Sequence, residues 1–379
     1  MAPNYGFFMP EFYAQEGLIA LENSLGMSAR LYRGFDEERR AFRKGETINI
    51  KRPGTFTVQD APATAEEIDV EGLSMTLGLW KEVKFKLTDK DLALTEDEVV
   101  QQHIQPAVYK LADYIDAASA ELALECPHIV DVGSPADVDD VIALRTNMFN
   151  RKVPIRDGGS VMVGGTTEGE LLALSAFAQN QGSGAGGIET QRTANLGERY
   201  GMRFFANQNV LTKGAGGSIT ASAAKVQGAT AKGATSVIVD DTTLTGTVKR
   251  GDVLVVTSTG QRIAITADAT ASGNAITLTV NPLRTALADN AGVTFVHPAT
   301  GVENLGFHPN FAAIAFAKLP DVLGRELGIK VASVQAPRSN IALRSRIYAM
   351  PNVSEVHVAF DVLLGMKVLD GDLACRWRD

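Results

Sequence analysis

Apolar positions along this chain change their spacing at about residue 213 and again at about residue 300. Between these points apolar and polar residues alternate in short runs, TSVIVDD (235–241), DVLVVTS (252–258), RIAITAD (262–268), AITLTVN (275–281) and VTFVH (293–297). Gly, Asn or Asp punctuates the runs, a pattern typical of short antiparallel strands joined by turns. Segment 213–300 is therefore predicted to be an antiparallel, barrel-like β-domain.

The composition of this segment also differs from that of its flanks. It contains no Glu, Trp or Met, and Phe295 is its only aromatic residue. Insertions are tolerated at exposed loops whose two ends lie close together. We therefore expect segment 213–300 to be inserted into a host domain and to fold alone when excised.

A long helix is predicted over about residues 96–125. Thr95 and Glu98 have the spacing of a capping box, and apolar residues then recur every three or four positions. These are Val100, Ile104, Val108, Leu111, Ile115, Ala118 and Leu122. Pro106 lacks a backbone N–H, so we expect it to kink the first turns.

The remaining pattern predicts a mixture of strands and shorter helices. Strand-like runs at 47–52 and 75–87 flank the acidic stretch 60–72, which predicts a protruding hairpin that needs another surface to lie on, such as a neighbouring subunit. Helices are expected at 11–33, 136–150, 168–179 and 311–318, and strands at 329–335, 342–349, 356–364 and 373–377. A long helix on an antiparallel sheet is an α+β arrangement.

Composition and charge exclude several classes of protein. The chain has 379 residues, of which 45% are apolar, and a formal net charge of -8. The acidic balance argues against a tight, sequence-reading nucleic-acid binder. No apolar run is long enough to span a bilayer, and the N-terminus lacks signal-peptide features. Cys126 and Cys375 are too few and too isolated for a disulfide framework, so we expect buried thiols in a reducing cytoplasm.

Candidate chemistry is sparse. The motif GSGAGG at 182–187 has the dinucleotide-binding spacing, but it follows a predicted helix where that fingerprint follows a strand, which favours a flexible loop. The five histidines lie at no metal-ligand spacing. We therefore predict no catalytic residue, no cofactor and no metal site.

Two charged clusters are the candidate contact sites between subunits. The basic cluster contains Arg33, Arg39, Arg40 and Arg43, and the acidic cluster at the hairpin tip contains Glu66, Glu67, Asp69 and Glu71. The basic residues are interleaved with acidic ones, so a solvated helix with internal ion pairs and a DNA-facing patch both compete with the contact interpretation. Across a subunit boundary such charges would set partner choice more than affinity.

Several segments in order along the chain resemble the major capsid proteins of tailed phages, which have the Hong Kong 97 fold. They are KFKLTDKDLALT (84–95), IQPAVYKLADYID (104–116), RYGMRFFANQNV (199–210), VKRGDVLVV (248–256), GVENLGFHPNFAAIAF (301–316) and DVLLGMKVLDGDLACRW (361–377). The resemblance is closest to the coat-protein family of short-tailed Salmonella phages, whose members carry an inserted β-domain.

The resemblance implies a domain layout. Residues 1–43 would be the N-terminal arm, 44–87 the extended loop (E-loop), and 88–186 the spine helix and P-domain. The A-domain would comprise 187–212 and 301–322, interrupted by the inserted β-domain 213–300, and 323–379 would supply the P-domain strands and C-terminus.

The resemblance also implies a function. Such a chain would assemble with itself, as pentamers and hexamers, into the icosahedral head shell around double-stranded DNA. Its other partners would be a scaffolding protein, a portal protein and, in some systems, a decoration protein, with only non-specific contact to packaged DNA and none to a membrane. It would assemble in the host cytoplasm and reside in the virion capsid. The alternatives are a β-rich surface or ligand-binding protein and an enzyme with an appended β-domain.

Overall fold

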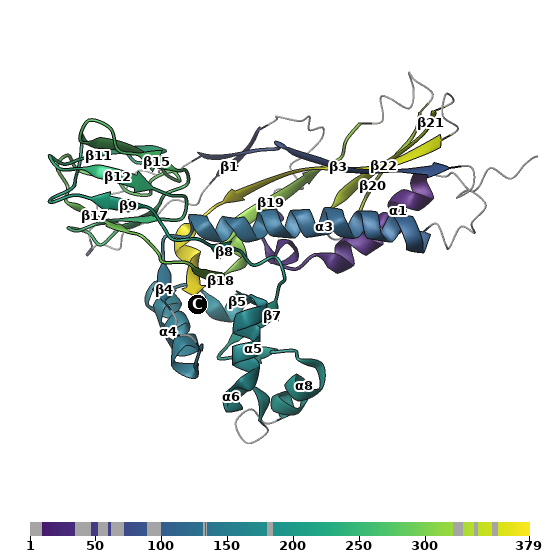
Figure 1. Cartoon of the computed structure of the whole chain (residues 1–379), viewed down its shortest axis with the longest axis horizontal. Helices are drawn as coiled ribbons and strands as arrows, with labels where there is room; N and C mark the ends of the chain where they lie inside the picture. Colours follow the sequence, from purple (N-terminus) through teal and green to yellow (C-terminus); the bar gives the residue numbers. More distant parts are fainter. Residues whose placement is uncertain are drawn as a thin grey trace, which may run out of the picture. The chain divides into compact units, whose positions relative to one another are not determined.

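The computed structural model describes residues 10–34, 47–51, 60–61, 72–88, 100–131, 133, 135–179, 185–320, 329–336, 340–350 and 355–379 (Figure 1). The chain forms two compact units. One comprises Met1–Ala118 with Ala313–Lys367, and the other comprises Ser119–Ala312 with Val368–Asp379. Each unit therefore combines segments that are far apart in the sequence.

A five-stranded sheet with β22 at its centre forms the framework of the first unit. β22 pairs in antiparallel register with β21 and with β3, so that Phe360 lies opposite both Ser345 and Val83. The strands are β3 (Leu79–Thr88), β19 (Ala312–Ala317), β20 (Lys330–Gln335), β21 (Ala342–Met350) and β22 (Glu355–Val368). The predicted strands at 329–335, 342–349 and 356–364 are confirmed to within a few residues.

Helix α1 (Pro10–Ser24) packs against β20 and β21 of this sheet. Tyr13 and Leu21 of this helix are buried. At Gly17 the approach is so close that a Cβ atom would lie 3.0 Å from Leu343 Cδ2 and 3.2 Å from Val108 Cγ2. This part of the predicted N-terminal arm is therefore a core helix of its own chain.

The predicted hairpin is present in part: β1 (Thr47–Lys51) pairs in antiparallel register with β2 (Gly72–Thr76). Most of its predicted second strand, at 75–87, is instead β3, which pairs with β22. The side chains of Ile48, Ile50, Leu73 and Met75 are all buried within the single chain. A neighbouring subunit is thus not needed to cover this face.

The predicted long helix consists of three segments with different hydrogen bonding. They are a π-helical turn η5 (Val100–Ile104), helix α3 (Gln105–Ala120) and a 3₁₀ segment η6 (Glu121–Glu125). Pro106 cannot donate a backbone hydrogen bond, which fits the disturbed turn just before it. The predicted capping residues Thr95 and Glu98 lie outside the described residues.

The second unit contains a seven-stranded sheet in which β18 lies between β23 and β5 and also pairs with β8. Its strands are β4 (Ile129–Asp131), β5 (Ser160–Val163), β6 (Glu198–Arg199), β7 (Met202–Ala206), β8 (Thr212–Lys213), β18 (Gly301–Phe307) and β23 (Ala374–Arg378). The helices are α4 (Val138–Asn150), α5 (Gly165–Ala173), α6 (Ser175–Ala178) and α8 (Ala185–Thr193). Asp137 caps α4 in a capping box with Asp140, and the buried face of α4 joins a core that includes Trp377.

Segment 213–300 contains all five predicted strand runs and has a hydrophobic core of its own. Its strands are β9 (Ser218–Thr220), β10 (Lys225–Val226), β11 (Ser236–Asp240), β12 (Thr245–Val248), β13 (Val253–Val256), β14 (Arg262–Ala264), β15 (Ala269–Thr270), β16 (Ala275–Thr279) and β17 (Val293–Val296). They form three three-stranded antiparallel sheets rather than one closed barrel. The sheets alternate inward and outward side chains, so that Val237 and Val239 are buried whereas Ile238 between them is exposed.

Two other predicted helices and the predicted glycine loop differ in the structure. The expected helix at 311–318 is wrong: a 3₁₀ turn η8 (Pro309–Phe311) leads into strand β19, whose six residues are all buried. A short, fully apolar run has no period that separates helix from strand. The expected helix at 168–179 is divided into α5 and α6, with extended backbone at Leu174. The flexible loop expected at 182–187 is wrong for residues 185–187, which form the first turn of α8, whereas residues 182–184 lie outside the described part; the helix before the motif is α6.

Candidate functional site

Only one of the eight predicted contact residues lies in the described part of the chain. Arg33 donates a hydrogen bond from Nη2 to the carbonyl oxygen of Ser28 at 2.9 Å, and its guanidinium carbon lies 5.9 Å from the centre of the Phe316 ring. Its side chain is thus engaged within its own unit. Arg39, Arg40, Arg43, Glu66, Glu67, Asp69 and Glu71 lie outside the described residues.

Helix α4 presents apolar side chains to solvent. Ile142 is 43% exposed and Phe149 is 65% exposed, whereas Val141, Leu144 and Met148 on the other side of the helix are buried. Ile142 and Phe149 are seven residues apart, so they lie on the same face. This surface was missed from the sequence, although the i, i+7 pair beside a regular buried stripe is visible there.

The two ends of segment 213–300 come together on strand β18. Lys213 and Thr212 of β8 pair with Gly301 and Val302, and Glu303 donates its backbone N–H to the Leu211 carbonyl at 2.9 Å. The segment therefore leaves and rejoins the sheet at one place. Five ionisable residues gather there, and we call them the neck cluster: Lys213, Asp252, His297, Glu303 and Arg376.

Arg376 and Glu303 form a fully buried ion pair in the neck cluster. Arg376 donates to Glu303 from Nε at 2.8 Å and from Nη2 at 2.6 Å, and both side chains have no exposed surface. The remaining nitrogen, Nη1, donates to the Gly251 carbonyl at 2.6 Å. Arg376 on β23 thus binds both β18 and the turn before β13, and so joins the sheet to segment 213–300.

Asp252 is the second centre of the cluster and is also fully buried. Its carboxylate accepts hydrogen bonds from His297 Nδ1 at 2.8 Å, from the Gly217 and Lys249 amides at 2.9 and 3.0 Å, and from Lys213 Nζ at 3.2 Å. Burial alone would raise the pKa of Asp252, but these donors outweigh it and lower the pKa to about 2. Burial lowers the pKa of Lys213, and Asp252 opposes that shift.

Ion pairs nearer the surface add to the junction. Arg250 bonds Glu121 at 3.1 Å and Glu125 at 3.4 Å. Arg284 bonds Asp372 at 3.0 Å and also pairs with Asp370. These side chains are partly exposed, so each pair contributes about 0–1 kcal/mol. Their shared effect is to fix the orientation of segment 213–300 on its own unit.

The carboxylates of the neck cluster, Asp252 and Glu303, are each bound by cations or backbone amides, which indicates that they hold the junction together. His297 is held by Asp252 through Nδ1, and its Nε2 is buried without a hydrogen-bond partner in the part of the chain that the structure describes. Among the described residues no group of His, Cys, Asp and Glu is arranged to hold a metal ion, and no helix is long and apolar enough to cross a membrane. The charged residues within the strands GVENLGF and ACRWR are visible in the sequence. The residues that pair with one another are far apart along the chain, so the sequence does not reveal the pairing.

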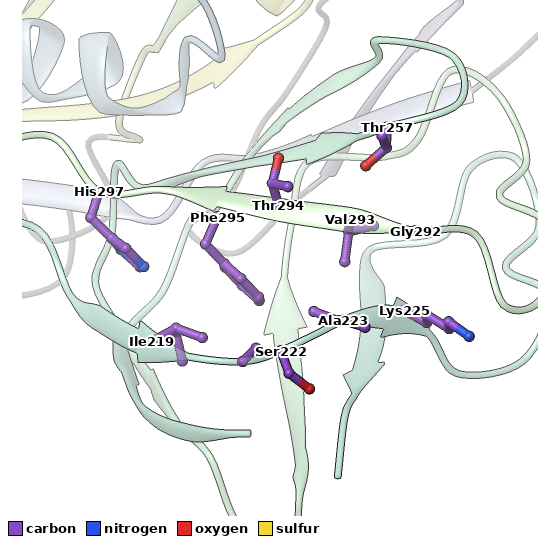
Figure 2. A pocket seen from close by; sticks show the side chains of 12 residues that line it. Ile219, Ser222, Ala223, Lys225, Thr257, Gly292, Val293, Thr294, Phe295 and His297 are labelled. Carbon is purple, nitrogen blue, oxygen red and sulfur yellow. The ribbon is translucent and has the colours of Figure 1, made fainter. Parts of the chain in front are cut away.

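A cavity of about 440 Å³ opens within segment 213–300. Figure 2 shows Phe295 and His297 extending from the same side of β17 toward the chain that carries Ile219 and Ser222. The Phe295 and His297 rings are stacked, with centroids 6.0 Å apart and planes 2° from parallel. The lining combines apolar side chains such as Ile219 and Phe295 with the polar side chains of Ser222, Lys225 and His297.

Comparison with known proteins gives matches in structure only. The sequence matches no family model and no curated protein. A solved structure from Mycobacterium phage Che8 is similar, with a TM-score of 0.51 and 13% identity over 93% of this chain and 90% of that one. The chain shares that fold.

Two further similar structures are described as capsids. The capsid structure of cyanophage P-SCSP1u gives a TM-score of 0.46 and 10% identity over 89% of this chain and 84% of that one. The mature capsid of bacteriophage PhiM1 gives 0.43 and 12% over 87% and 81%.

Proposed function

We propose that this chain is the major capsid protein of a tailed phage, with a Hong Kong 97-like fold, and that it assembles with itself into the icosahedral head shell around double-stranded DNA. The observation that carries the proposal is the fold shared with a Mycobacterium phage structure over nearly the full length of both chains. A similarity that extends over both units is more informative than one shared motif, because it includes the order of the elements and the connections between them. The order of sequence segments that resemble tailed-phage capsid proteins supports the same conclusion.

The domain layout is proposed on the same basis. Segment 213–300 is proposed to be an insertion, as in the coat proteins of short-tailed Salmonella phages. Its separate core and the pairing of β8 with β18 support this, because they bring the two ends of the segment together. The proposed arm is 1–43 and the proposed extended loop is 44–87, which includes the β1–β2 hairpin. The remaining boundaries are those inferred from the sequence.

The proposed role is assembly rather than catalysis. The exposed face of α4 with Ile142 and Phe149 is the described surface that we expect a neighbouring subunit to cover. The charged clusters Arg39–Arg43 and Glu66–Glu71 are proposed to select the partner. A scaffolding protein, a portal protein, a decoration protein and non-specific contact with packaged DNA complete the proposed set of partners, in a shell assembled in the host cytoplasm.

Electron microscopy with sedimentation tests this proposal. The purified chain is examined over a range of concentrations, alone and co-expressed with its neighbouring genes. Closed shells, tubes or sheets are the expected result, and Phe149→Glu is expected to reduce them without lowering the melting temperature, since Phe149 is mostly exposed. Monomers under both conditions would contradict the proposal and favour the β-rich binding protein.

A further inference from the structure

The cavity in segment 213–300 lies between the edges of two strands, β9 and β17. Ile219 is on one wall and Phe295 on the other, with Lys225 and His297 also lining the space (Figure 2). Lys225 and His297 are the ionisable side chains among the lining residues, and no carboxylate lines the cavity. The lining therefore has no negatively charged side chain that would attract a cation.

The backbone of β17 at Phe295 faces the cavity side of the strand. Gly292 accepts from Thr257 at 2.9 Å on the β13 side, whereas Val293 donates to Ala224 at 2.9 Å on the opposite side. Successive residues of a strand direct their N–H and C=O groups to alternate sides. The N–H and C=O of Phe295 thus point away from β13, and they have no partner among the described residues.

The facing strand β9 has the same property at Ile219. Ile219 lies opposite Gly246 of β12. Gly246 uses its carbonyl to accept from Ala271 at 2.9 Å, on the far side of β12. The pair Ile219 and Gly246 is therefore not hydrogen-bonded, and the backbone groups of Ile219 also point outward from their sheet.

Backbone hydrogen bonds close this gap at both ends. One end is the bond from Val293 to Ala224, and the other is the bond from Gly216 to the Pro298 carbonyl at 2.7 Å. Between them the side with Ile219 is three residues longer than the side with Phe295, since 224 minus 216 is eight and 298 minus 293 is five. The side with Ile219 therefore does not pair residue by residue with β17 between these two bonds, and the cavity lies in this interval.

We propose that this gap binds a short extended segment of a second copy of this chain. The segment pairs by its main chain with β17 at Phe295 and buries an apolar side chain between Phe295 and Ile219. Unpaired strand edges recognise a peptide main chain, and the pockets beside them select side chains. The second copy is the occupant because the proposed shell places many copies side by side, and on that function the inference rests.

The sequence of the chain contains a segment with the complementary pattern. In residues 67–71 the apolar Ile68 and Val70 alternate with Glu67, Asp69 and Glu71. Alternation with period two sends the apolar side chains to one face and the carboxylates to the other. The apolar pair complements Phe295 and Ile219, and the acidic net charge of the segment suits a lining whose ionisable side chains, Lys225 and His297, include no carboxylate.

Peptide binding to the unassembled full chain tests the interaction. A dye-labelled peptide EEIDVEG, the sequence of residues 66–72, is titrated with the protein and followed by fluorescence anisotropy. We expect saturable binding that Ile219→Glu weakens at least about tenfold. The matched control Ile238→Glu carries the same change at a side chain of the same segment that is 39% exposed and outside the cavity, and it is expected to leave binding within about twofold.

A second peptide separates main-chain pairing from simple charge attraction. Proline in place of Asp69 keeps both apolar residues but removes one backbone donor, and we expect it to abolish binding. Absence of saturable binding by EEIDVEG, or equal binding to Ile219→Glu, would overturn the proposal.

Hydrogen exchange in assembled particles separates failure of this inference from failure of the proposed function. The Phe295 amide is expected to exchange at least about tenfold more slowly in shells than in the unassembled chain. Shells in which that amide exchanges as fast as before would overturn the inference and leave the capsid function intact. Protection that requires a co-expressed second protein would also overturn it, because the occupant would then not be a copy of this chain.

Discussion

Removing the carboxylate of Glu303 is expected to be among the most destabilising single changes in the second unit. Glu303 accepts two hydrogen bonds from Arg376, at 2.8 and 2.6 Å, and Arg378 Nε lies 3.5 Å from the same carboxylate. Glu303→Ala would leave Arg376 charged and fully buried. Breaking a buried ion pair in this way costs about 3–5 kcal/mol, and two charge-assisted hydrogen bonds at about 1.5–3 kcal/mol each give a similar range.

The assay is urea unfolding of the unassembled chain, followed by tryptophan fluorescence, to which Trp377 contributes from a buried position on the same strand as Arg376. With a slope of about 1–3 kcal/mol/M, the expected loss moves the midpoint by more than about 1 M. Glu189→Ala is the matched control, because its pair with Arg192 is long, at 3.8 Å, and exposed, and we expect a change below about 0.5 kcal/mol.

A double variant completes the test. Glu303→Leu with Arg376→Met removes both charges and leaves apolar side chains, so it is expected to be less destabilised than either single change to an uncharged residue. If Glu303→Ala lowers the free energy of unfolding by less than about 1 kcal/mol, the reasoning is refuted. A guanidinium that is buried without its carboxylate partner should cost more than this.

Four other outcomes are expected. Gly251→Ala should cost at least about 1 kcal/mol in urea unfolding, because Gly251 has a φ of +91° and an added Cβ would lie 3.1 Å from both Leu124 and Lys213; an unchanged midpoint would contradict this. The pKa of Asp252 is lowered by folding, so its stabilising effect is complete above the unfolded value near 4 and is lost as pH falls toward 2; Asp252→Asn should flatten this part of an acid titration followed by circular dichroism. Burial raises the pKa of Cys126 to about 11 and that of Cys375 to about 12, so neither thiol should react with a disulfide reagent at pH 8 until the chain unfolds. The excised segment 213–300 should give a dispersed NMR spectrum, and a collapsed spectrum would show that its core depends on the neck cluster.

Much of the secondary structure follows from local patterns. The helix expected at 136–150 was predicted from its local sequence alone, and α4 (Val138–Asn150) begins within two residues of that position. The run at 311–318 failed because all six residues of β19 are buried, and such a strand lacks the alternation that identifies one-sided strands. The surface on α4 and the neck cluster were missed because exposure and pairing depend on what packs nearby.

The sequence by itself determined the α+β class, the strand-rich nature of segment 213–300 and its separate core, because hydrophobic periodicity of two or 3.6 residues is a local property. Only the tertiary structure decided that the segment forms three sheets, that α1 packs on the sheet of its own chain, and that Asp252, Glu303 and Arg376 become buried together. These residues come from strands and turns separated by up to 124 positions, since 376 minus 252 is 124. Their charges are stable in the interior only when folding brings each one within hydrogen-bonding distance of its partner.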